Sequence, residues 1–287
     1  SPAEYAHGHI PGARSLPLFS DDERAAIGTL YKQESRGVAI RRGLEIIGPK
    51  MADLVAQVDA QVPAGGRLQL HCWRGGMRSA SVAWLLETAG FKVEVVKGGY
   101  KAWRQNGLML FERPWKIKIL TGHTGSAKTE ILHEMKKLGA QVIDLEGLAH
   151  HRGSSFGALG QAAQPSTEHF HNLLFTALHA VDPLQDLWLE DESVHIGKCH
   201  LPENFFTQMR QAPWVRVEMP RQRRIDHIVK LYGQADRNEL EEATVRIAKR
   251  LGGQRLNDAL ECLRADDLAG CTDHLLHYYD RAYDRSM

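Results

Sequence analysis

Hydrophobic and polar residues follow a strand–loop–helix–strand order in the first third of the chain. Residues 67–71 have the pattern of a short strand, residues 80–89 carry apolar side chains at helical spacing, and residues 91–96 alternate like a second strand. Two polar stretches ahead of them, 20–33 and 49–61, are predicted to be helical. This order is typical of an α/β domain with parallel strands.

The same order starts again after residue 114. A strand is predicted at 115–120, followed by the glycine-containing loop TGHTGSAKT and a helix that runs to about Leu138. Further strands are predicted at 141–144, 186–189 and 214–218. From Arg221 onward the pattern is mainly helical, with a clear apolar period over 240–251.

Length and composition agree with two globular domains. The chain has 287 residues, which is too long for one ordinary core, and the restart predicts domains at 1–111 and 112–287. A hydrophobic content of 43% and a charged content of 25% are those of an ordinary globular protein. The formal net charge of +1 means that any basic surface must be local. No apolar run approaches the roughly 20 residues of a membrane helix, so no membrane partner is expected.

The chain has four scattered cysteines without a CxxC pair: Cys72, Cys199, Cys262 and Cys271. This usage predicts neither a disulfide framework nor a structural zinc site, and it fits a reducing cytoplasm. The pairs His150-His151 and Cys199-His200 lack the spacing of metal ligands, so no metal centre is predicted from them.

One cysteine stands in a loop that has the pattern of a reactive site. His71-Cys72-Trp73-Arg74-Gly75-Gly76-Met77-Arg78-Ser79 joins a predicted strand to a predicted helix. Backbone N–H groups in such a loop, together with the helix dipole, favour a thiolate over a thiol and bind a tetrahedral anion. Arg78 can offer a planar fork to that anion, and Arg74 faces either the anion or a substrate. We therefore predict Cys72, Arg74 and Arg78 as catalytic residues.

The alternative for Cys72 is a small buried apolar side chain at a strand end. Two arginines, two glycines and the following helix argue against it. Five residues separate Cys72 from Arg78, a C-x5-R spacing that also serves cysteine phosphatases and fits a phosphate-sized anion. A phosphatase function thus remains open at this stage.

The second loop, 122–129, has the setting of a Walker A motif between a strand and a helix. Backbone N–H groups of such a loop wrap a diphosphate, Lys128 neutralises it, and Thr129 can hold Mg²⁺. Ala127 stands where a glycine is expected, and its methyl group restricts the backbone. The alternative is a glycine-rich turn with a solvated lysine. The predicted binding residues of the loop are Gly122, Gly125, Ser126, Ala127, Lys128 and Thr129.

Acidic residues after the predicted strands are less specific. Asp144 and Glu146 lie in DLEGLAHHRGSSFG, which also carries Arg152, and a run from Glu190 to Ser193 follows another strand. These carboxylates can hold a metal ion or act as a base, and ordinary helix caps explain them equally well. Asp144, Glu146 and Arg152 are predicted to belong to the binding site of the second domain.

Basic residues gather between Arg210 and Lys230: Arg210, Arg216, Arg221, Arg223, Arg224 and Lys230. Arginines at this density can contact the phosphates of a polynucleotide or clamp a diphosphate. On charge alone a solvated helix face is slightly favoured.

Several of these motifs resemble known families. AEYAHGHIPGARSLP, the Cys72 loop and AGFKVEVVKGGYKAWR together resemble a rhodanese domain, without the strand that precedes them in that family. A rhodanese domain followed by a P-loop domain that carries DLEGLAHHRGSSFG and LEDES closely resembles the bacterial tRNA 2-selenouridine synthases.

That resemblance implies a transferase that works on 2-thiouridine at the wobble position of tRNA. It implies S-geranylation from geranyl diphosphate, then replacement of the S-geranyl group by selenium from selenophosphate. The Lys128 loop would hold the diphosphate, with Mg²⁺ as a candidate cofactor, and Cys72 would attack or carry the selenium donor. Expected partners are the anticodon region of tRNA and the synthase that supplies selenophosphate. Alternatives are a C-x5-R phosphatase or sulfurtransferase with a nucleotide-binding domain, and a non-catalytic tRNA-binding module.

Overall fold

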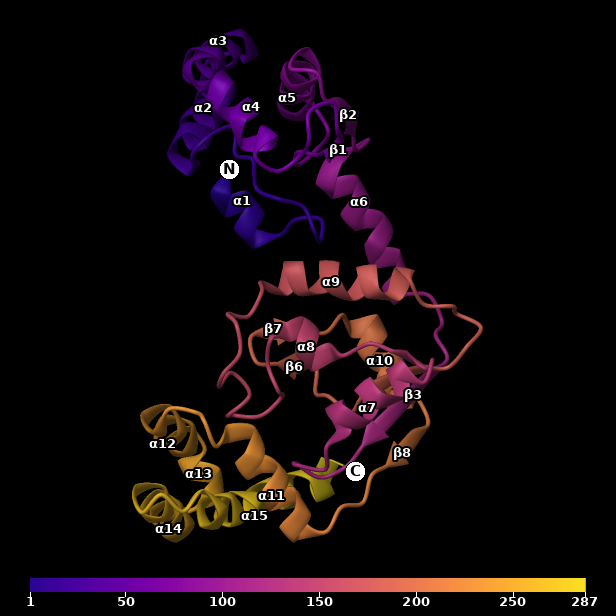
Figure 1. Cartoon of the computed structure of the whole chain (residues 1–287), viewed down its shortest axis with the longest axis vertical. Coiled ribbons are helices and arrows are strands. Elements are labelled where there is room, and N and C mark those ends of the chain that lie inside the picture. The colour runs from indigo at the N-terminus through magenta and orange to yellow at the C-terminus, as the bar shows by residue number, and fades with distance from the viewer. Residues whose placement is uncertain (287) are drawn as a thin grey trace. The chain divides into compact units, whose positions relative to one another are not determined.

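The computed structural model describes residues 1–286 and divides the chain into two compact units (Figure 1). The first unit comprises Ser1–Met109, and the second begins at Leu110. None of the helices within residues 1–286 is both long and apolar enough to cross a membrane.

The first unit is an α/β structure with a small parallel sheet. Its elements are α1 (Pro2–His7), α2 (Asp21–Gln33), α3 (Arg36–Ile47), the 3-10 turn η1 (Gly48–Lys50), α4 (Met51–Asp59), β1 (Arg67–Leu70), α5 (Met77–Thr88), β2 (Lys92–Val95) and α6 (Gly99–Leu108). β1 and β2 pair in parallel, with Leu68 opposite Val93. The core between strands and helices is built on Val58, Val82, Leu86 and Phe91.

Local capping explains where two helices of this unit begin. Ser20 and Glu23 form a reciprocal capping box at the start of α2, where a helix is predicted from the sequence. Ser35 caps α3 through the backbone N–H of Val38. The sequence pattern predicts neither α3 nor the short α1.

The second unit has a four-stranded sheet in which every pairing is parallel. Its strands are β3 (Ile117–Thr121), β4 (Gln141–Val142), β5 (Leu187–Glu190) and β8 (Trp214–Arg216), in the order β4-β5-β3-β8. β3 leads into the loop 122–127, and its Leu120 lies opposite Glu190 of β5. The carboxyl ends of these central strands therefore bring the loop and the acidic run to one edge of the sheet.

Helices and a small hairpin complete the second unit. They are α7 (Lys128–Lys137), α8 (Leu145–Ala149), α9 (Thr167–His179), β6 (His195–Ile196), β7 (Cys199–His200), α10 (Glu203–Gln211), α11 (Arg221–Tyr232), α12 (Arg237–Arg246), α13 (Ala248–Leu251), α14 (Gly253–Arg264) and α15 (Leu268–Ser286). The 3-10 turn η2 (Met109–Phe111) spans the boundary between the two units. Figure 1 shows α11 to α15 gathered at one end of this unit. They share an apolar core that includes Leu240, Ala243, Leu263 and Leu275.

The predicted fold class is confirmed: a rhodanese-like α/β unit is followed by a parallel-sheet unit with a helical C-terminal part. The helical period expected over 240–251 is divided at Ile247, where α12 ends and α13 begins.

Candidate functional site

The Cys72 loop is held by close backbone packing. The carbonyl oxygen of Cys72 accepts a hydrogen bond from the backbone N–H of Tyr100 at 3.0 Å. Gly75 has φ +63°, and a Cβ there would lie 2.7 Å from the backbone nitrogen of Gly99. Glycine is therefore required where the loop contacts the start of α6, because any side chain would push the two segments apart.

Hydrogen bonds around the sulfur favour its charged form. The Cys72 Sγ lies 3.2 Å from the hydroxyl oxygen of Ser79, a residue with 2% exposure in the first turn of α5. Burial alone would raise the pKa of Cys72. Hydrogen bonds from the Ser79 side chain and from the backbone N–H groups of Arg74, Ser79 and Gly76 outweigh burial and lower that pKa. The thiol is therefore readily ionised, which is the property of a nucleophilic cysteine.

The two arginines of the loop have different surroundings. The Arg78 Nη1 donates to Glu4 Oε2 at 2.8 Å, so its charge is partly neutralised by the first helix of the chain. Arg74 is exposed. Both Arg78 and Cys72 line a hollow of about 190 Å³, which we call the Cys72 hollow. The structure thus adds Glu4 to the surroundings of the thiol, a residue that the motif alone does not single out.

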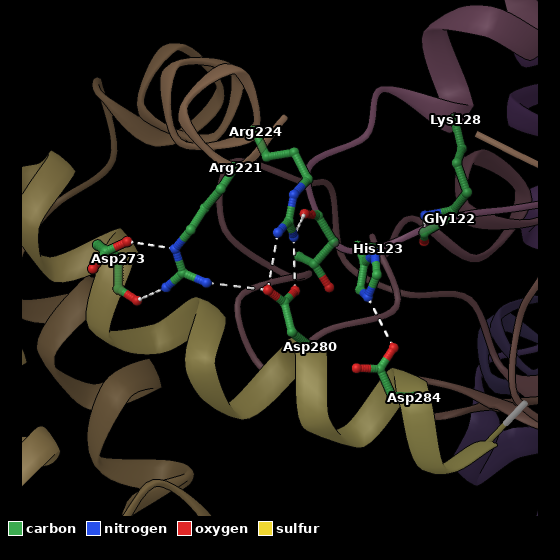
Figure 2. A network of polar contacts seen from close by, with 9 residues as sticks. Gly122, His123, Lys128, Arg221, Arg224, Asp273, Asp280 and Asp284 are labelled. Atoms are coloured by element: carbon green, nitrogen blue, oxygen red, sulfur yellow. Dashed lines mark hydrogen bonds and ion pairs between the residues drawn. The ribbon is translucent and has the colours of Figure 1, made fainter. Parts of the chain in front are cut away.

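The second loop has the backbone of a phosphate-binding turn. Ala127 has φ +58°, the left-handed conformation in which a glycine is expected. The Lys128 Nζ donates to the Gly122 carbonyl oxygen at 3.2 Å (Figure 2), and the His123 Nε2 is paired with Asp284 Oδ1 at 3.0 Å. The Ser126 hydroxyl is buried at 1% residue exposure without a hydrogen-bond partner.

A single cavity of about 580 Å³ begins at this loop, and we call it the Lys128 cavity. All six predicted loop residues line it, together with Asp144, Glu146 and Arg152. Apolar side chains from the C-terminal helices form much of its remaining wall: Ile228, Leu231, Leu240, Leu263, Leu268, Leu275 and Leu276. The volume lies within the roughly 300–1,000 Å³ of small-molecule sites. One cavity therefore combines a polar end with a long apolar wall.

Three carboxyl groups converge beside Lys128 and Thr129. One oxygen from each of Glu146, Glu190 and Glu192 lies within 4.8 Å of the others. The Thr129 hydroxyl donates to Glu146 Oε2 at 3.3 Å. Glu190, with 1% exposure, has an Oε1 without a partner.

Burial and mutual repulsion change the acidity of these groups. Burial and the charges of Glu190 and Glu192 raise the pKa of Glu146 to about 9. Burial and the charge of Glu190 raise the pKa of Glu192 to about 7, and burial also raises the pKa of Glu190. The cluster consequently retains protons at neutral pH. Glu190 and Glu192 were not among the predicted site residues. The acidic run that follows a buried strand was the sequence feature that could have identified them.

Asp144 and Arg152 have structural contacts as well as a place in the cavity wall. Asp144 caps α8, accepting from the backbone N–H of Gly147 at 2.7 Å, and pairs with His133 Nε2 at 2.9 Å. The Arg152 guanidinium lies over the Tyr232 ring, 5.6 Å from its centroid. Asp144 is thus a helix cap, as the alternative interpretation of the sequence proposed.

Arginines of the predicted basic segment form ion pairs and hydrogen bonds within the second unit. The Arg224 guanidinium makes two hydrogen bonds to the Asp280 carboxylate, at 2.7 and 2.9 Å (Figure 2). It makes another to the Thr124 carbonyl oxygen at 3.2 Å. Arg221 pairs with Asp280 at 3.2 Å and with Asp273 at 2.7 Å. These arginines anchor α15 to the loop rather than forming the solvated helix face that charge alone slightly favoured.

Family models match both units. The model described as tRNA 2-selenouridine synthase AAA domain matches residues 115–287, and the rhodanese-like domain model matches residues 1–106. The chain belongs to the tRNA 2-selenouridine synthase family.

Three relatives named tRNA 2-selenouridine synthase show how much of the chain this family covers. The protein of Nitrosomonas europaea is 36% identical over 83% of this chain and 64% of its own length. Those of Shewanella loihica and Pseudomonas putida are 36% and 35% identical, over 94% and 99% of this chain and 77% and 85% of their own lengths. The chain thus spans 64% to 85% of these three synthases, and both candidate loops lie in matched domains.

Proposed function

We propose that this enzyme converts 2-thiouridine at the wobble position of tRNA to 2-selenouridine in two transfers, with the Lys128 cavity serving geranylation and Cys72 serving selenation. The observation that carries the first assignment is the shape of the Lys128 cavity. A phosphate-binding loop at one end and leucine side chains along the wall fit a molecule with a diphosphate head and a branched hydrocarbon tail. Geranyl diphosphate has this form.

In the first transfer, the sulfur of 2-thiouridine attacks C1 of geranyl diphosphate. A sulfur–carbon bond forms, the carbon–oxygen bond to the diphosphate breaks, and the diphosphate leaves with the bonding pair, while the N3 proton of the nucleoside is released to water. Lys128 and the backbone N–H groups of the loop stabilise the negative charge that develops on it. Apolar side chains around the tail keep water from the reacting carbon.

The residues beside Lys128 also fit a Mg²⁺ ion. The Thr129 hydroxyl and the unpartnered, buried Glu190 Oε1 are oxygen donors of the kind this ion prefers. When bound, Mg²⁺ would neutralise part of the charge of a diphosphate. The Glu190 Oε1, which is buried without a hydrogen-bond partner, would then have the cation as its partner.

In the second transfer, Cys72 acts as a phosphoryl acceptor. Its thiolate attacks the phosphorus of selenophosphate, so a sulfur–phosphorus bond forms and the phosphorus–selenium bond breaks. Selenium leaves with the bonding pair and, once protonated, is hydroselenide. Water then hydrolyses the phosphocysteine to inorganic phosphate and free thiolate. The loop suits this step because five residues between Cys72 and Arg78 enclose a phosphate-sized anion.

Hydroselenide completes the conversion of the nucleoside. It attacks C2 of the S-geranyl uridine, a carbon–selenium bond forms, and geranylthiolate leaves with the electrons of the carbon–sulfur bond. Alkylation is needed because the thiocarbonyl sulfur is a poor leaving group and a thiolate is a better one. No external reductant is required in this sequence.

The test is mass spectrometry of nucleosides from 2-thiouridine-containing tRNA incubated with the protein, geranyl diphosphate and selenophosphate. We expect S-geranyl-2-thiouridine with geranyl diphosphate alone and 2-selenouridine when both donors are present. Equilibrium binding of geranyl diphosphate and of ATP is measured in parallel. If the protein binds ATP tightly and does not bind geranyl diphosphate, the assignment of the Lys128 cavity to geranylation is wrong.

The C-x5-R spacing and the lowered pKa of Cys72 also favour a second candidate, a cysteine phosphatase. It predicts hydrolysis of a generic phosphomonoester that Cys72→Ser abolishes, with no change in any tRNA nucleoside. The nucleoside analysis separates the two functions.

A further inference from the structure

The C-terminal helices carry a run of basic side chains that the two transfers do not use. Six of them line two adjoining hollows of the second unit, and we call this set the basic strip: Arg246, Lys249, Arg250, Arg255, Arg281 and Arg285. The hollows have volumes of about 1000 and 290 Å³ and share Arg250. Among the described residues that line either one, none is Asp or Glu.

The positive charge of the strip is not cancelled in the way that it is in α11. Arg221 and Arg224 are paired with Asp273 and Asp280 on one side of α15. By contrast, Arg246 and Arg250 donate to uncharged groups, the Ser155 carbonyl oxygen at 3.0 Å and the Tyr278 hydroxyl at 3.2 Å. Both guanidinium groups are exposed and keep their full charge.

A neighbouring histidine has a pKa that two arginines of the strip help to lower. Burial, followed by the positive charges of Arg221, Arg255 and Arg281, lowers the pKa of His277, and the charge of Asp273 opposes this shift. His277 lines the smaller hollow with the strip. In a chain with a net charge of only +1, this is a marked local excess of positive charge.

The larger hollow meets the Lys128 cavity. Gly153, Ser154 and Ser193 line both spaces, so they form a shared wall. Gly153 has φ +65°, and a Cβ there would lie 2.9 Å from both Glu192 carboxylate oxygens. Gly153 therefore lies against the Glu192 carboxylate beside Lys128, and it also lines the hollow that holds part of the basic strip.

We propose that the basic strip binds the ribose–phosphate backbone of the tRNA anticodon arm and directs its thiouridine past Gly153 into the Lys128 cavity. Arginines and lysines that line hollows with no Asp or Glu among the described lining residues are of the kind that binds a polynucleotide backbone. A base that undergoes chemistry must leave its stack and enter a pocket, which requires the backbone to be held beside that pocket. This proposal rests on the proposed function, because it takes the Lys128 cavity as the site of alkylation.

The experiment compares two doubly charge-reversed full-length chains. Lys249→Glu with Arg281→Glu alters the strip, and Lys136→Glu with Lys137→Glu alters exposed lysines at the far end of α7 by the same total charge. Binding of tRNA is measured by fluorescence anisotropy over a range of salt concentrations. We expect the strip variant to bind about tenfold more weakly at about 0.1 M salt, with a salt slope lower by about one to two, and the α7 variant to match the wild type.

Two further measurements keep the outcomes distinct. Geranyl diphosphate binding should be unchanged in the strip variant, which shows that the fold and the cavity are intact. Geranylation should show a raised KM for tRNA and a kcat close to that of the wild type. Equal tRNA binding by the strip variant and the wild type, or equal weakening in both variants, would overturn the proposal. If the wild type does not bind geranyl diphosphate at all, the proposed function is overturned. Weaker tRNA binding by the strip variant would in that case still identify the strip as an RNA-binding surface.

Discussion

The two candidate loops have the same strand–loop–helix form, but their surroundings shift the pKa values of the acidic groups in opposite directions. Each leaves a parallel strand and begins a helix, so backbone N–H groups point into each loop. Around Cys72 the hydrogen bonds outweigh burial and lower the pKa of the thiol. Around Lys128 three carboxyl groups converge, and burial with mutual repulsion raises their pKa values.

The difference indicates what each site needs before it can work. The Cys72 loop lowers the pKa of its thiol through its own hydrogen bonds, so it favours the nucleophilic form without a bound ion. The Lys128 cavity holds more carboxyl groups than one lysine can neutralise, so a bound cation would relieve repulsion there. One kind of strand–loop–helix turn thus carries a thiol with a lowered pKa in one unit and lies beside carboxyl groups with raised pKa values in the other.

The largest expected effect comes from removing the nucleophile. Cys72→Ser should lower selenation by at least about 10³-fold, because a serine hydroxyl stays protonated where the thiol ionises. Geranylation should continue, so S-geranyl-2-thiouridine accumulates in the nucleoside analysis. In the wild type, rapid quenching should reveal a phosphorylated Cys72 peptide when selenophosphate is present.

The matched control for this change is Cys262→Ser. Cys262 is half-buried like Cys72, but burial and nearby acidic residues raise its pKa, so its thiol stays protonated. We expect normal selenation from this variant. Full activity of Cys72→Ser would mean that the lowered pKa of Cys72 has no catalytic use, and the comparison between the loops would fail.

The next effect concerns the cation of the other loop. Lys128→Ala should weaken geranyl diphosphate binding by about 10²-fold, because a buried diphosphate loses its charge partner. No S-geranyl product should form at low donor concentration. Lys137→Ala, on the exposed end of the same helix, should bind the donor normally in the same titration. An unchanged affinity in Lys128→Ala would show that the loop does not hold the diphosphate.

Local signals made much of the fold predictable. The helix at α2 was expected from the polar, helical pattern over 20–33, and both functional loops were found because their residues are contiguous in sequence. Helix α3 was missed because two glycines weaken its pattern. Gly43 is in fact a packing position, since a Cβ there would lie 3.7 Å from the Phe19 ring.

Contacts between residues that lie far apart in the chain could not be predicted from the sequence. Glu4 reaches Arg78 across 74 positions, and no periodic pattern signals that contact. Glu146 meets Glu190 and Glu192 only because β5 and the start of α8 share one edge of the sheet. The apolar wall of the Lys128 cavity is likewise contributed by α11, α12, α14 and α15, which follow the loop by roughly 100 to 150 residues.

A smaller effect should appear in the pH dependence of stability. The pKa of Glu192 is raised from 4.5 to about 7 in the folded protein. As pH rises, the unfolded chain loses this proton first, so the free energy of unfolding falls between about pH 4.5 and 7. Glu146, with its pKa near 9, extends the fall to higher pH. Glu192→Gln should therefore gain about 1–3 kcal/mol over the wild type at pH 8 and little at pH 4.5.

Urea denaturation at several pH values measures this change. Glu261→Gln, an exposed carboxyl group on α14, is the control and should leave the pH profile unaltered. If Glu192→Gln is less stable than the wild type at pH 8, the carboxyl groups do not repel one another in the folded protein. The contrast with the Cys72 loop would then lose its electrostatic basis.

The smallest expected effect tests the backbone of the Lys128 loop. At φ +58° the methyl group of Ala127 costs about 1 kcal/mol, whereas glycine adopts this conformation freely but loses more entropy on folding. Ala127→Gly should therefore change the free energy of unfolding by less than about 1 kcal/mol and geranyl diphosphate affinity by less than about twofold. Ala259→Gly, in the interior of α14, has no such compensation and should destabilise by about 1 kcal/mol or more. A large gain in affinity from Ala127→Gly would mean that the methyl group crowds the diphosphate, and that this loop is a weaker anion site than the one around Cys72.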